Sequence, residues 1–202
     1  MKRMSTPKKL ILISVILLVL DQCVKFWIKT SFTLGEEIRI FDWFRLLFVE
    51  NPGMAFGMKL GEGNVWKIVL TSFRIVASAG IIWYIRKLIK EQAPTGVLIC
   101  LTLILCGALG NLIDSIFYGV IFSASTPYHV AEFLPAEGGY TSLLCGKVVD
   151  MLYFPLIVKG DFIFFRPVFN FADSYITIGA AVLIIFYRKF FSTTKGNEQQ
   201  QS

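Results

Sequence analysis

The fold follows from an apolar run at residues 10–28, which reads LILISVILLVLDQCVKFWI and follows a nine-residue segment with four basic residues. About 20 apolar residues in a helix are enough to cross the hydrocarbon core of a bilayer. A basic start and an apolar middle also fit a cleaved signal peptide. However, no small-x-small cleavage site follows Leu20, because the chain continues Asp21-Gln22-Cys23 and then becomes apolar again. We therefore expect a retained membrane helix.

Three further apolar runs follow, at about residues 65–85, 95–118 and 170–187. Hydrophobic residues make up 55% of the chain and charged residues 17%, against about a quarter in an ordinary soluble domain. The sequence thus predicts an all-α integral membrane protein with four transmembrane helices. We expect one membrane-embedded domain over residues 1–190 and a disordered cytoplasmic tail over 191–202.

The basic residues predict the orientation. Ten of the 20 lie in three short segments: the N-terminus, the link at 86–94 and the residues after Tyr187. Because cytoplasmic segments are enriched in Lys and Arg, both termini should be cytoplasmic and the long loops 29–64 and 119–169 should face outward. Nucleic-acid binding is not expected despite the net charge of +6, since the basic residues flank apolar runs.

The first outer loop contains EEIRIFDWFRLLFVENPGMAFG at residues 36–57. Its β-branched and aromatic residues, bounded by Gly and Pro, predict short strands at the membrane surface. The helices should therefore carry a small β-rich extracytoplasmic platform.

Ionisable groups are costly inside a membrane and usually have a function there. Asp21 and Lys25 share one helix face, as do Asn111 and Asp114 in the third run and Asn170 and Asp173 in the fourth. With the predicted orientation, these groups lie at the same outer depth, and Asp150 returns toward it from the second outer loop. Topology alone therefore predicts a cluster of carboxylates.

Two interpretations of this cluster stay open from the residues alone. Two carboxylates in a pocket of low dielectric share a proton, which is the basis of aspartic-protease chemistry. Alternatively, the Asp residues cap helices or pair with Lys25, Arg74 and Arg166, and Asp21 with Lys25 simply forms a salt bridge.

Other chemistries have less support. The single histidine, His129, lies in a loop, which disfavours a zinc site or a Ser-His-Asp triad. A Ser/Lys dyad of Ser174 and Lys147 remains an alternative. The four cysteines have no paired spacing and are expected to be buried apolar side chains. We expect no metal and no cofactor.

Five motifs occur in order along the chain: Asp21-Gln-x-x-Lys25, Asn51-Pro-Gly53-Met-Ala-Phe56, Gly110-Asn111-Leu-Ile-Asp114, Val148-Val-Asp150 and Phe169-Asn170-Phe-Ala-Asp173. Together they resemble the bacterial lipoprotein signal peptidase (signal peptidase II) family, over roughly residues 10–187.

The resemblance implies a membrane aspartic endopeptidase that cleaves lipid-modified prolipoproteins before the diacylglyceryl cysteine and is inhibited by globomycin-like peptides. The implied enzyme lies in the bacterial cytoplasmic (inner) membrane, among membrane lipid, with its site at the extracytoplasmic face; we expect a monomer. Asp150 and Asp173 would be catalytic. The implied binding or supporting residues are Asn51, Gly53, Asn111, Asp114, Asn170, Asp21 and Lys25.

Three features depart from the family pattern. Ser115 stands where the family usually has Arg, which removes a fixed cation beside Asp114. Pro52 and Met54 replace Thr and Ala in the outer-loop motif, and Pro52 lacks a backbone donor. The segment Val120–Gly146 is longer than usual and suggests an extra outer loop.

Two rival functions use the same carboxylates. A small transporter or proton-relay protein would need a transmembrane path, whereas these Asp residues lie at helix ends on one side. A non-enzymatic assembly factor would use the polar cluster only to pack its helices.

Overall fold

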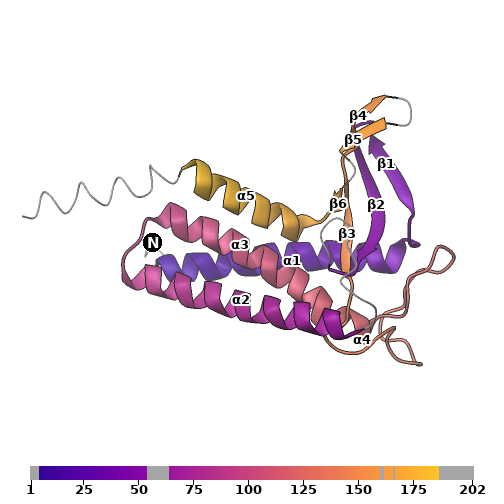
Figure 1. The fold of residues 1–202 in the computed structure, drawn as a ribbon, viewed down its shortest axis with the longest axis horizontal. Helices are drawn as coiled ribbons and strands as arrows, with labels where there is room; N and C mark the ends of the chain where they lie inside the picture. Colours follow the sequence, from indigo (N-terminus) through magenta and orange to yellow (C-terminus); the bar gives the residue numbers. More distant parts are fainter. Residues whose placement is uncertain (1–4, 54–63, 160–161, 166, 187–202) are drawn as a thin grey trace, which may run out of the picture.

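Long helices lie side by side, and a small antiparallel sheet stands across one end of them (Figure 1). The computed structural model describes residues 5–53, 64–159, 162–165 and 167–186. The main helices are α1 Thr6–Ser31, α2 Asn64–Lys90, α3 Thr95–Ile113 and α5 Phe171–Ile185. A π-helical segment, η2 Asp114–Tyr118, and the short α4 Gly119–Ile121 continue α3 toward the sheet end.

Among the described residues, three helices are long and apolar enough to cross a membrane: Thr6–Ser31, Asn64–Lys90 and Thr95–Ile121. The predicted fourth span, 170–187, corresponds to the 15 residues of α5. At 1.5 Å per residue α5 is about 22 Å long, which is less than the ~30 Å hydrocarbon core. A helical membrane protein with a small sheet is therefore confirmed, whereas four spans remain a prediction. Tyr187 and the predicted tail lie outside the described residues.

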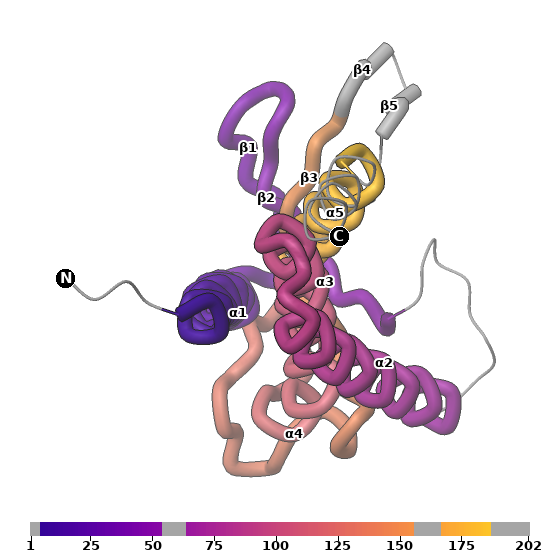
Figure 2. The backbone as a smooth tube through the Cα atoms, turned by 90° about the vertical axis from the view of Figure 1, so that its left-hand side faces the viewer, coloured from indigo at the N-terminus to yellow at the C-terminus, as the bar shows by residue number. Residues whose placement is uncertain are grey.

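The helix α3 is central, since it packs against α1, α2 and α5 (Figure 2). Close approach to α5 depends on glycine. A Cβ at Gly107 would lie 2.2 Å from the carbonyl oxygen of Ala172, and one at Gly179 would lie 2.7 Å from that of Cys100. These glycines let the two backbones meet, as is common between membrane helices.

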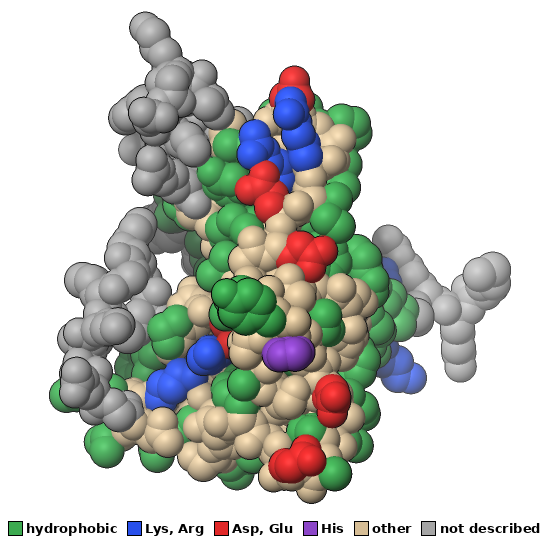
Figure 3. Space-filling view, turned by 90° about the vertical axis from the view of Figure 1, so that its right-hand side faces the viewer, with side chains coloured by type: hydrophobic (Ala, Val, Ile, Leu, Met, Phe, Trp, Pro, Cys, Tyr) green, Lys and Arg blue, Asp and Glu red, His purple; other side chains and the backbone are tan. Residues whose placement is uncertain are grey.

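The helix surfaces and the sheet end differ in polarity. Apolar side chains on α1 and α2, among them Ile11, Val15, Phe73 and Val76, are more than half exposed. The end beyond the helices gathers acidic, basic and histidine side chains (Figure 3). An apolar side wall with a charged end is the surface expected of a protein embedded in a bilayer.

The main sheet has the strand order β1-β2-β3-β6, and all its pairs are antiparallel. Its strands are β1 Glu37–Phe41, β2 Phe44–Asn51, β3 Val148–Tyr153 and β6 Val168–Phe169. A second ladder pairs β4 Leu156–Lys159 with β5 Phe162–Phe165. Strands β1 and β2 confirm those predicted within residues 36–57, and β3 is buried along its whole length.

The core of the sheet end lies between α1, β2, β3 and the chain after α4. Its fully buried members are Ile28, Phe48, Phe122, Val149 and Met151. Because β3 passes through this core, the backbone that carries Asp150 is held from both sides. This rigidity matters for the site described below.

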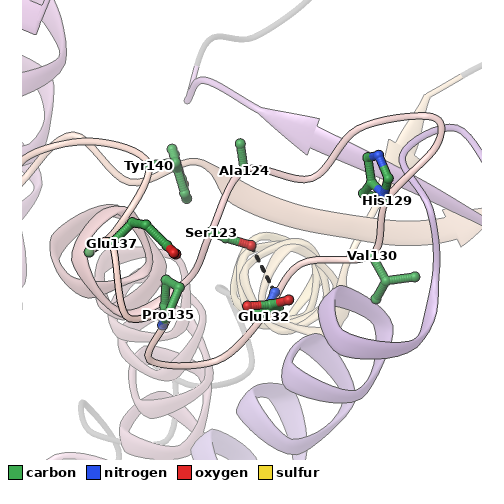
Figure 4. Close-up of a pocket in the computed structure, with 9 residues that line it drawn as sticks. Ser123, Ala124, His129, Val130, Glu132, Pro135, Glu137 and Tyr140 are labelled. Carbon is green, nitrogen blue, oxygen red and sulfur yellow. Dashed lines mark hydrogen bonds between the residues drawn. The ribbon is translucent and has the colours of Figure 1, made fainter.

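The loop between α4 and β3, residues 122–147, is irregular apart from a bridge between Phe122 and Phe133. It encloses a pocket whose wall includes His129 and Glu137 and in which the Glu132 amide donates to Ser123 Oγ at 2.8 Å (Figure 4). None of the pocket residues belongs to the predicted carboxylate cluster, so His129 lies apart from it.

The four cysteines are free. Cys100, Cys106 and Cys145 are buried as predicted, but Cys23 is exposed, so the prediction was wrong there. Cys23 lies two residues from Asp21 and from Lys25. Two residues rotate a helix by about 200°, which turns Cys23 away from the buried face of α1.

Candidate active site

Asp150 lies in the middle of β3, opposite Val49 of β2. Its side chain is 2% exposed and accepts two hydrogen bonds from amides. Asn170 Nδ2 donates to Oδ1 at 2.6 Å, and Asn51 Nδ2 donates to Oδ2 at 3.1 Å. The carboxyl group is therefore held on both oxygens by neutral donors.

Asp173 lies in the first turn of α5 and takes part in a capping box with Asn170. Asn170 Oδ1 accepts from the Asp173 amide at 2.9 Å, and Asp173 Oδ2 accepts from the Asn170 amide at 3.3 Å. The other carboxylate oxygen, Oδ1, accepts from Asn111 Nδ2 at 2.8 Å. Helix capping thus fixes this carboxylate, while its second oxygen is oriented by α3.

Asn170 connects the two carboxylates. It is fully buried at the N-cap of α5, where its Nδ2 donates to the carboxylate of Asp150 and its backbone amide donates to the carboxylate of Asp173. Its Nδ2 also lies 3.1 Å from Asn111 Oδ1 and 3.3 Å from the Val149 carbonyl oxygen. Every polar group of this buried amide therefore has a partner, which is the condition for a rigid polar network.

Burial raises the pKa of Asp150 to about 7, and the neighbouring charge of Asp173 acts in the same direction. Hydrogen bonds from Asn51 and Asn170 stabilise the ionised form and act in the opposite direction. A carboxyl group with this pKa exchanges its proton near neutral pH, as a general acid or base must.

A second carboxylate pair lies beside the first. Lys25 Nζ is 3.0 Å from Asp21 Oδ2 and 2.9 Å from Asp114 Oδ2, and all three side chains are at most 1% exposed. Gln22 Nε2 donates to both carboxylates, at 3.1 Å and 2.9 Å. The expected Asp21–Lys25 salt bridge is thus confirmed, and we name this group the Asp21–Lys25–Asp114 cluster.

The Asp21–Lys25–Asp114 cluster also holds the surroundings of the first pair. Lys25 Nζ donates to Asn111 Oδ1 at 3.0 Å, so the Nδ2 of Asn111 points to Asp173. Asp114 Oδ2 accepts from the amide of Val149 at 3.2 Å, next to Asp150 in β3. A Cβ at Gly110 would lie 2.6 Å from Asp21 Oδ2, so glycine is needed there.

All nine predicted site residues meet in one hydrogen-bonded network. Gly53 joins it through its amide, which donates to Asn51 Oδ1 at 2.8 Å. Asp21 joins α5 by accepting from the amide of Ala172 at 2.9 Å. Their individual catalytic and supporting roles remain predictions. Met54, Ala55, Phe56 and Arg166 lie outside the described residues.

Two alternatives from the sequence are not supported. Arg74 donates to Ser115 Oγ at 3.0 Å and, among the described residues, forms no ion pair with an Asp side chain. Ser174 Oγ donates to the carbonyl of Asn170, whereas Lys147 Nζ contacts Glu50 Oε2 at 2.7 Å. A Ser/Lys dyad of these two residues is therefore contradicted.

The sequence did not predict a third polar group, which we name the Glu50 cluster. Glu50 Oε1 accepts from Lys29 Nζ at 2.5 Å and from Ser125 Oγ at 3.0 Å, and Lys147 contacts the other oxygen. Burial alone would raise the pKa of Glu50, but Lys29 and Lys147 hold it below its usual value. The sequence feature that could have predicted this cluster is Lys29, which lies one helical turn after Lys25 on the same face.

In the parts of the chain that the structure describes, no group of three or more His, Cys, Asp or Glu side chains could hold a metal ion. The side chains that bond Asp150 and Asp173 there are the amides of Asn51, Asn111 and Asn170.

Known proteins resemble this chain along most of its length. The family model described as "Signal peptidase (SPase) II" matches residues 13–189. A lipoprotein signal peptidase of Porphyromonas gingivalis is 45% identical over 205 residues, covering 95% of this chain and 88% of that protein. Another, from Amoebophilus asiaticus, is 37% identical over 187 residues, covering 86% and 75%.

A solved "Bacterial membrane enzyme structure" has the same fold, with a TM-score of 0.61 at 23% identity, covering 90% of this chain and 88% of that one. The motifs of the sequence, the membrane helices and the relatives agree with one another. The chain belongs to the signal peptidase II family of peptidases.

Proposed function

We propose that this protein removes the signal peptide from lipid-modified prolipoproteins by aspartic-peptidase chemistry at Asp150 and Asp173, cleaving before the diacylglyceryl cysteine. Membership of the family supports the removal of signal peptides from prolipoproteins. The observation that carries the aspartic mechanism is that one buried residue, Asn170, bonds both carboxylates: its side-chain amide donates to Asp150 Oδ1 and its backbone amide donates to Asp173 Oδ2.

The two carboxyl groups share one proton in the reactive state. The ionised carboxylate takes a proton from a water molecule, whose oxygen attacks the scissile carbonyl carbon. The protonated carboxyl hydrogen-bonds the carbonyl oxygen and transfers its proton as the tetrahedral intermediate forms. The pair then donates a proton to the leaving nitrogen, and a hydroxyl group of the intermediate returns a proton to the pair as the C–N bond breaks. This releases the new amino terminus and leaves one proton on the pair, as at the start.

The surroundings favour this shared proton. Amide groups orient both carboxylates, and among the described residues neither Asp150 nor Asp173 forms an ion pair with a cation. The pKa of Asp150, raised to about 7 by burial and by Asp173, allows one proton to remain on the pair at neutral pH. Because the groups titrate together, the apparent pKa values belong to the pair.

We further propose that four helices cross the bacterial inner membrane, with α5 and the residues after it as the fourth span and residues 1–190 as one domain. The start of α1 and the α2–α3 link lie at the end opposite the sheet (Figure 1). The basic flanks are concentrated there. Both termini would then be cytoplasmic, and the site would face the extracytoplasmic surface.

The sheet would hold the extended substrate segment, and a globomycin-like peptide would occupy the same place. Asn51 lies at the end of β2, and its side chain contacts Asp150. An extended substrate peptide would therefore pair with the backbone near Asn51, as an added strand does at a sheet edge. The diacylglyceryl chains of the substrate would remain in membrane lipid alongside the helices.

The test is a gel-shift cleavage assay with purified protein and a diacylglyceryl-modified prolipoprotein. We expect Asp150→Asn and Asp173→Asn to lower cleavage at least about 1,000-fold, because each removes a group that must ionise or donate a proton. Globomycin should inhibit the wild-type protein.

Asp42→Asn is the matched control, since Asp42 is an exposed carboxylate at the β1–β2 turn whose partner is Arg39. This variant should cleave at the wild-type rate. Normal turnover by a folded Asp150→Asn or Asp173→Asn protein would rule out the dyad. A folded wild-type protein with pH-driven ion flux and no cleavage would favour the transporter instead.

A further inference from the structure

Arg74 is a charged residue in the middle of the apolar helix α2 and is not part of the predicted site. Its neighbours in sequence, Phe73 and Ile75, are exposed on the helix surface, whereas Arg74 is half-buried. An arginine within a membrane-spanning segment is costly and usually faces a functional polar region. Its contacts therefore indicate what it does.

One contact leads to Asp150. Arg74 Nη2 donates to the carbonyl oxygen of Gly53 at 3.1 Å, and the amide of Gly53 donates to Asn51 Oδ1 at 2.8 Å. Asn51 Nδ2 in turn donates to Asp150 Oδ2 at 3.1 Å. The guanidinium thus holds the short turn that aims the Asn51 amide at the carboxyl group.

The backbone conformation of Gly53 and its missing side chain allow this contact. Its φ is +92°, a conformation that side chains other than hydrogen disfavour. A Cβ there would lie 3.1 Å from Leu70 Cδ2 and 3.2 Å from Arg74 Nη1. Glycine therefore allows the guanidinium to reach the backbone of the turn.

The other contact leads to Asp173. Arg74 Nη1 donates to Ser115 Oγ at 3.0 Å, and Ser115 Oγ donates to the backbone carbonyl oxygen of Asn111 at 2.9 Å. Asn111 Nδ2 donates to Asp173 Oδ1 at 2.8 Å. Ser115 is 3% exposed, so this branch runs through the protein interior.

We propose that Arg74 is a positioning residue for cleavage, which fixes Asn51 on Asp150 through Gly53 and Asn111 on Asp173 through Ser115. The proposal rests on the proposed function of the two Asp residues as the catalytic pair. A forked guanidinium can bond two elements at once, which the single ammonium of lysine does less well. The small Ser115 leaves room at α3 for a cation supplied by α2.

The charge of Arg74 should also affect the pH dependence of cleavage, which can be measured separately from the rate. Arg74 interacts electrostatically with Asp173, Asp114 and Asp150. Lys25 also acts on Asp150 and pairs with Asp21 and Asp114, and Lys67 on α2 lies within electrostatic range of Arg74. A cation favours the ionised form of a carboxyl group. Its removal should therefore raise the apparent pKa values of the catalytic pair and move the pH profile of kcat upward.

The experiment compares Arg74→Gln, Arg74→Lys and Ser115→Ala in the cleavage assay, with kcat and KM measured across pH. We expect Arg74→Gln to lower kcat about 100-fold, with KM within about threefold of wild type, because misaligned reacting groups slow the chemical step. Its pH profile should move upward by about half a unit to one unit. Arg74→Lys should lose about tenfold in kcat and keep the wild-type profile.

Ser115→Ala breaks only the Asp173 branch and should lower kcat about three- to tenfold without moving the pH profile. Ser78→Ala is the control on α2, since Ser78 is buried and its hydroxyl has no partner in the described structure. It should retain wild-type kinetics.

A folded Arg74→Gln protein with wild-type kcat and pH profile would overturn the proposal. If that variant does not fold, wild-type kcat in both Arg74→Lys and Ser115→Ala overturns it. Asp150→Asn and Asp173→Asn in the same assay separate the two proposals. Activity in these variants contradicts the dyad itself, whereas their inactivity beside a normal Arg74→Gln protein contradicts only the role of Arg74.

Discussion

Two pairs of carboxylates lie next to each other in this protein, but they are held by different kinds of group. Asp21 and Asp114 share the ammonium of Lys25, at 3.0 Å and 2.9 Å. Asp150 and Asp173 both accept from Asn170, Asp150 from its side-chain amide and Asp173 from its backbone amide. A cation compensates buried negative charge, whereas an amide orients a carboxylate and leaves its charge in place. The first pair therefore suits a structural role and the second suits proton transfer.

The neighbouring strands β2 and β3 also differ in the partners of their buried carboxylates. Glu50, at the end of β2, lies between Lys29 and Lys147, and these cations keep its pKa below the usual value even though burial opposes them. Asp150 on β3 has amide partners, and its pKa is raised to about 7 by burial and by Asp173. Burial alone thus does not determine the protonation of a carboxyl group; the charge of its partners decides.

The largest effect should come from removing the cation of the structural pair. Lys25→Met leaves Asp21 and Asp114 buried without their shared ammonium, and we expect a loss of about 3–5 kcal/mol in unfolding free energy. The measurement is denaturant or thermal unfolding of the purified protein in detergent micelles.

The matched control neutralises the whole group with Asp21→Asn, Lys25→Met and Asp114→Asn together. This triple variant should recover much of the lost stability, because replacing a buried ionic group by neutral side chains is often nearly neutral. A Lys25→Met protein as stable as wild type would mean that the two carboxylates are not compensated by Lys25.

The convergence of the carboxylates was predictable because it depends on local patterns and topology. Asn111 with Asp114, and Asn170 with Asp173, are three residues apart on helices, which places each pair on one face. The capping box of Asn170 and Asp173 is likewise a local signature. Once the direction of each helix is known, their depth in the bilayer follows, and the family could be named from the same motifs.

Contacts between distant segments were not predictable. Glu50 meets Ser125 and Lys147 only because β2 pairs with β3 and the long loop folds back on α1. Arg74 reaches Ser115 because α2 packs against α3 in one particular rotation. Neither the register of two strands nor the rotation of two apolar helices can be read from single-chain periodicity.

The contrast in protonation predicts opposite effects of pH on stability. Asp150 has a folded pKa of about 7, above the unfolded value of about 3.9, so between these values only the folded state keeps the proton. Its contribution is full below about pH 4 and is lost as the pH rises to about 7, which amounts to about 4 kcal/mol. Asp150→Asn should remove this decline.

Glu50 should behave in the reverse manner, because its folded pKa is lowered. Its contribution is present above the unfolded pKa of about 4.3 and is lost as pH falls through the folded pKa. Unfolding free energies measured from pH 3 to 8 for wild type, Asp150→Asn and Glu50→Gln test both signs. An unchanged decline between pH 4 and 7 in Asp150→Asn would contradict the assignment for Asp150.

The smallest effect should come from the exposed side of the Glu50 cluster. Lys147 contacts Glu50 Oε2 at 2.7 Å, but its side chain is 39% exposed, whereas that of Lys29 is fully buried. Lys147→Met leaves Glu50 with Lys29 and Ser125, so we expect at most about 1 kcal/mol of destabilisation and unchanged cleavage. Lys29→Met, the matched variant, should cost several times more, because Glu50 then lacks its buried partner. Equal losses measured by unfolding in detergent would mean that the two lysines compensate Glu50 equally, and solvent exposure would then not distinguish the two ion pairs.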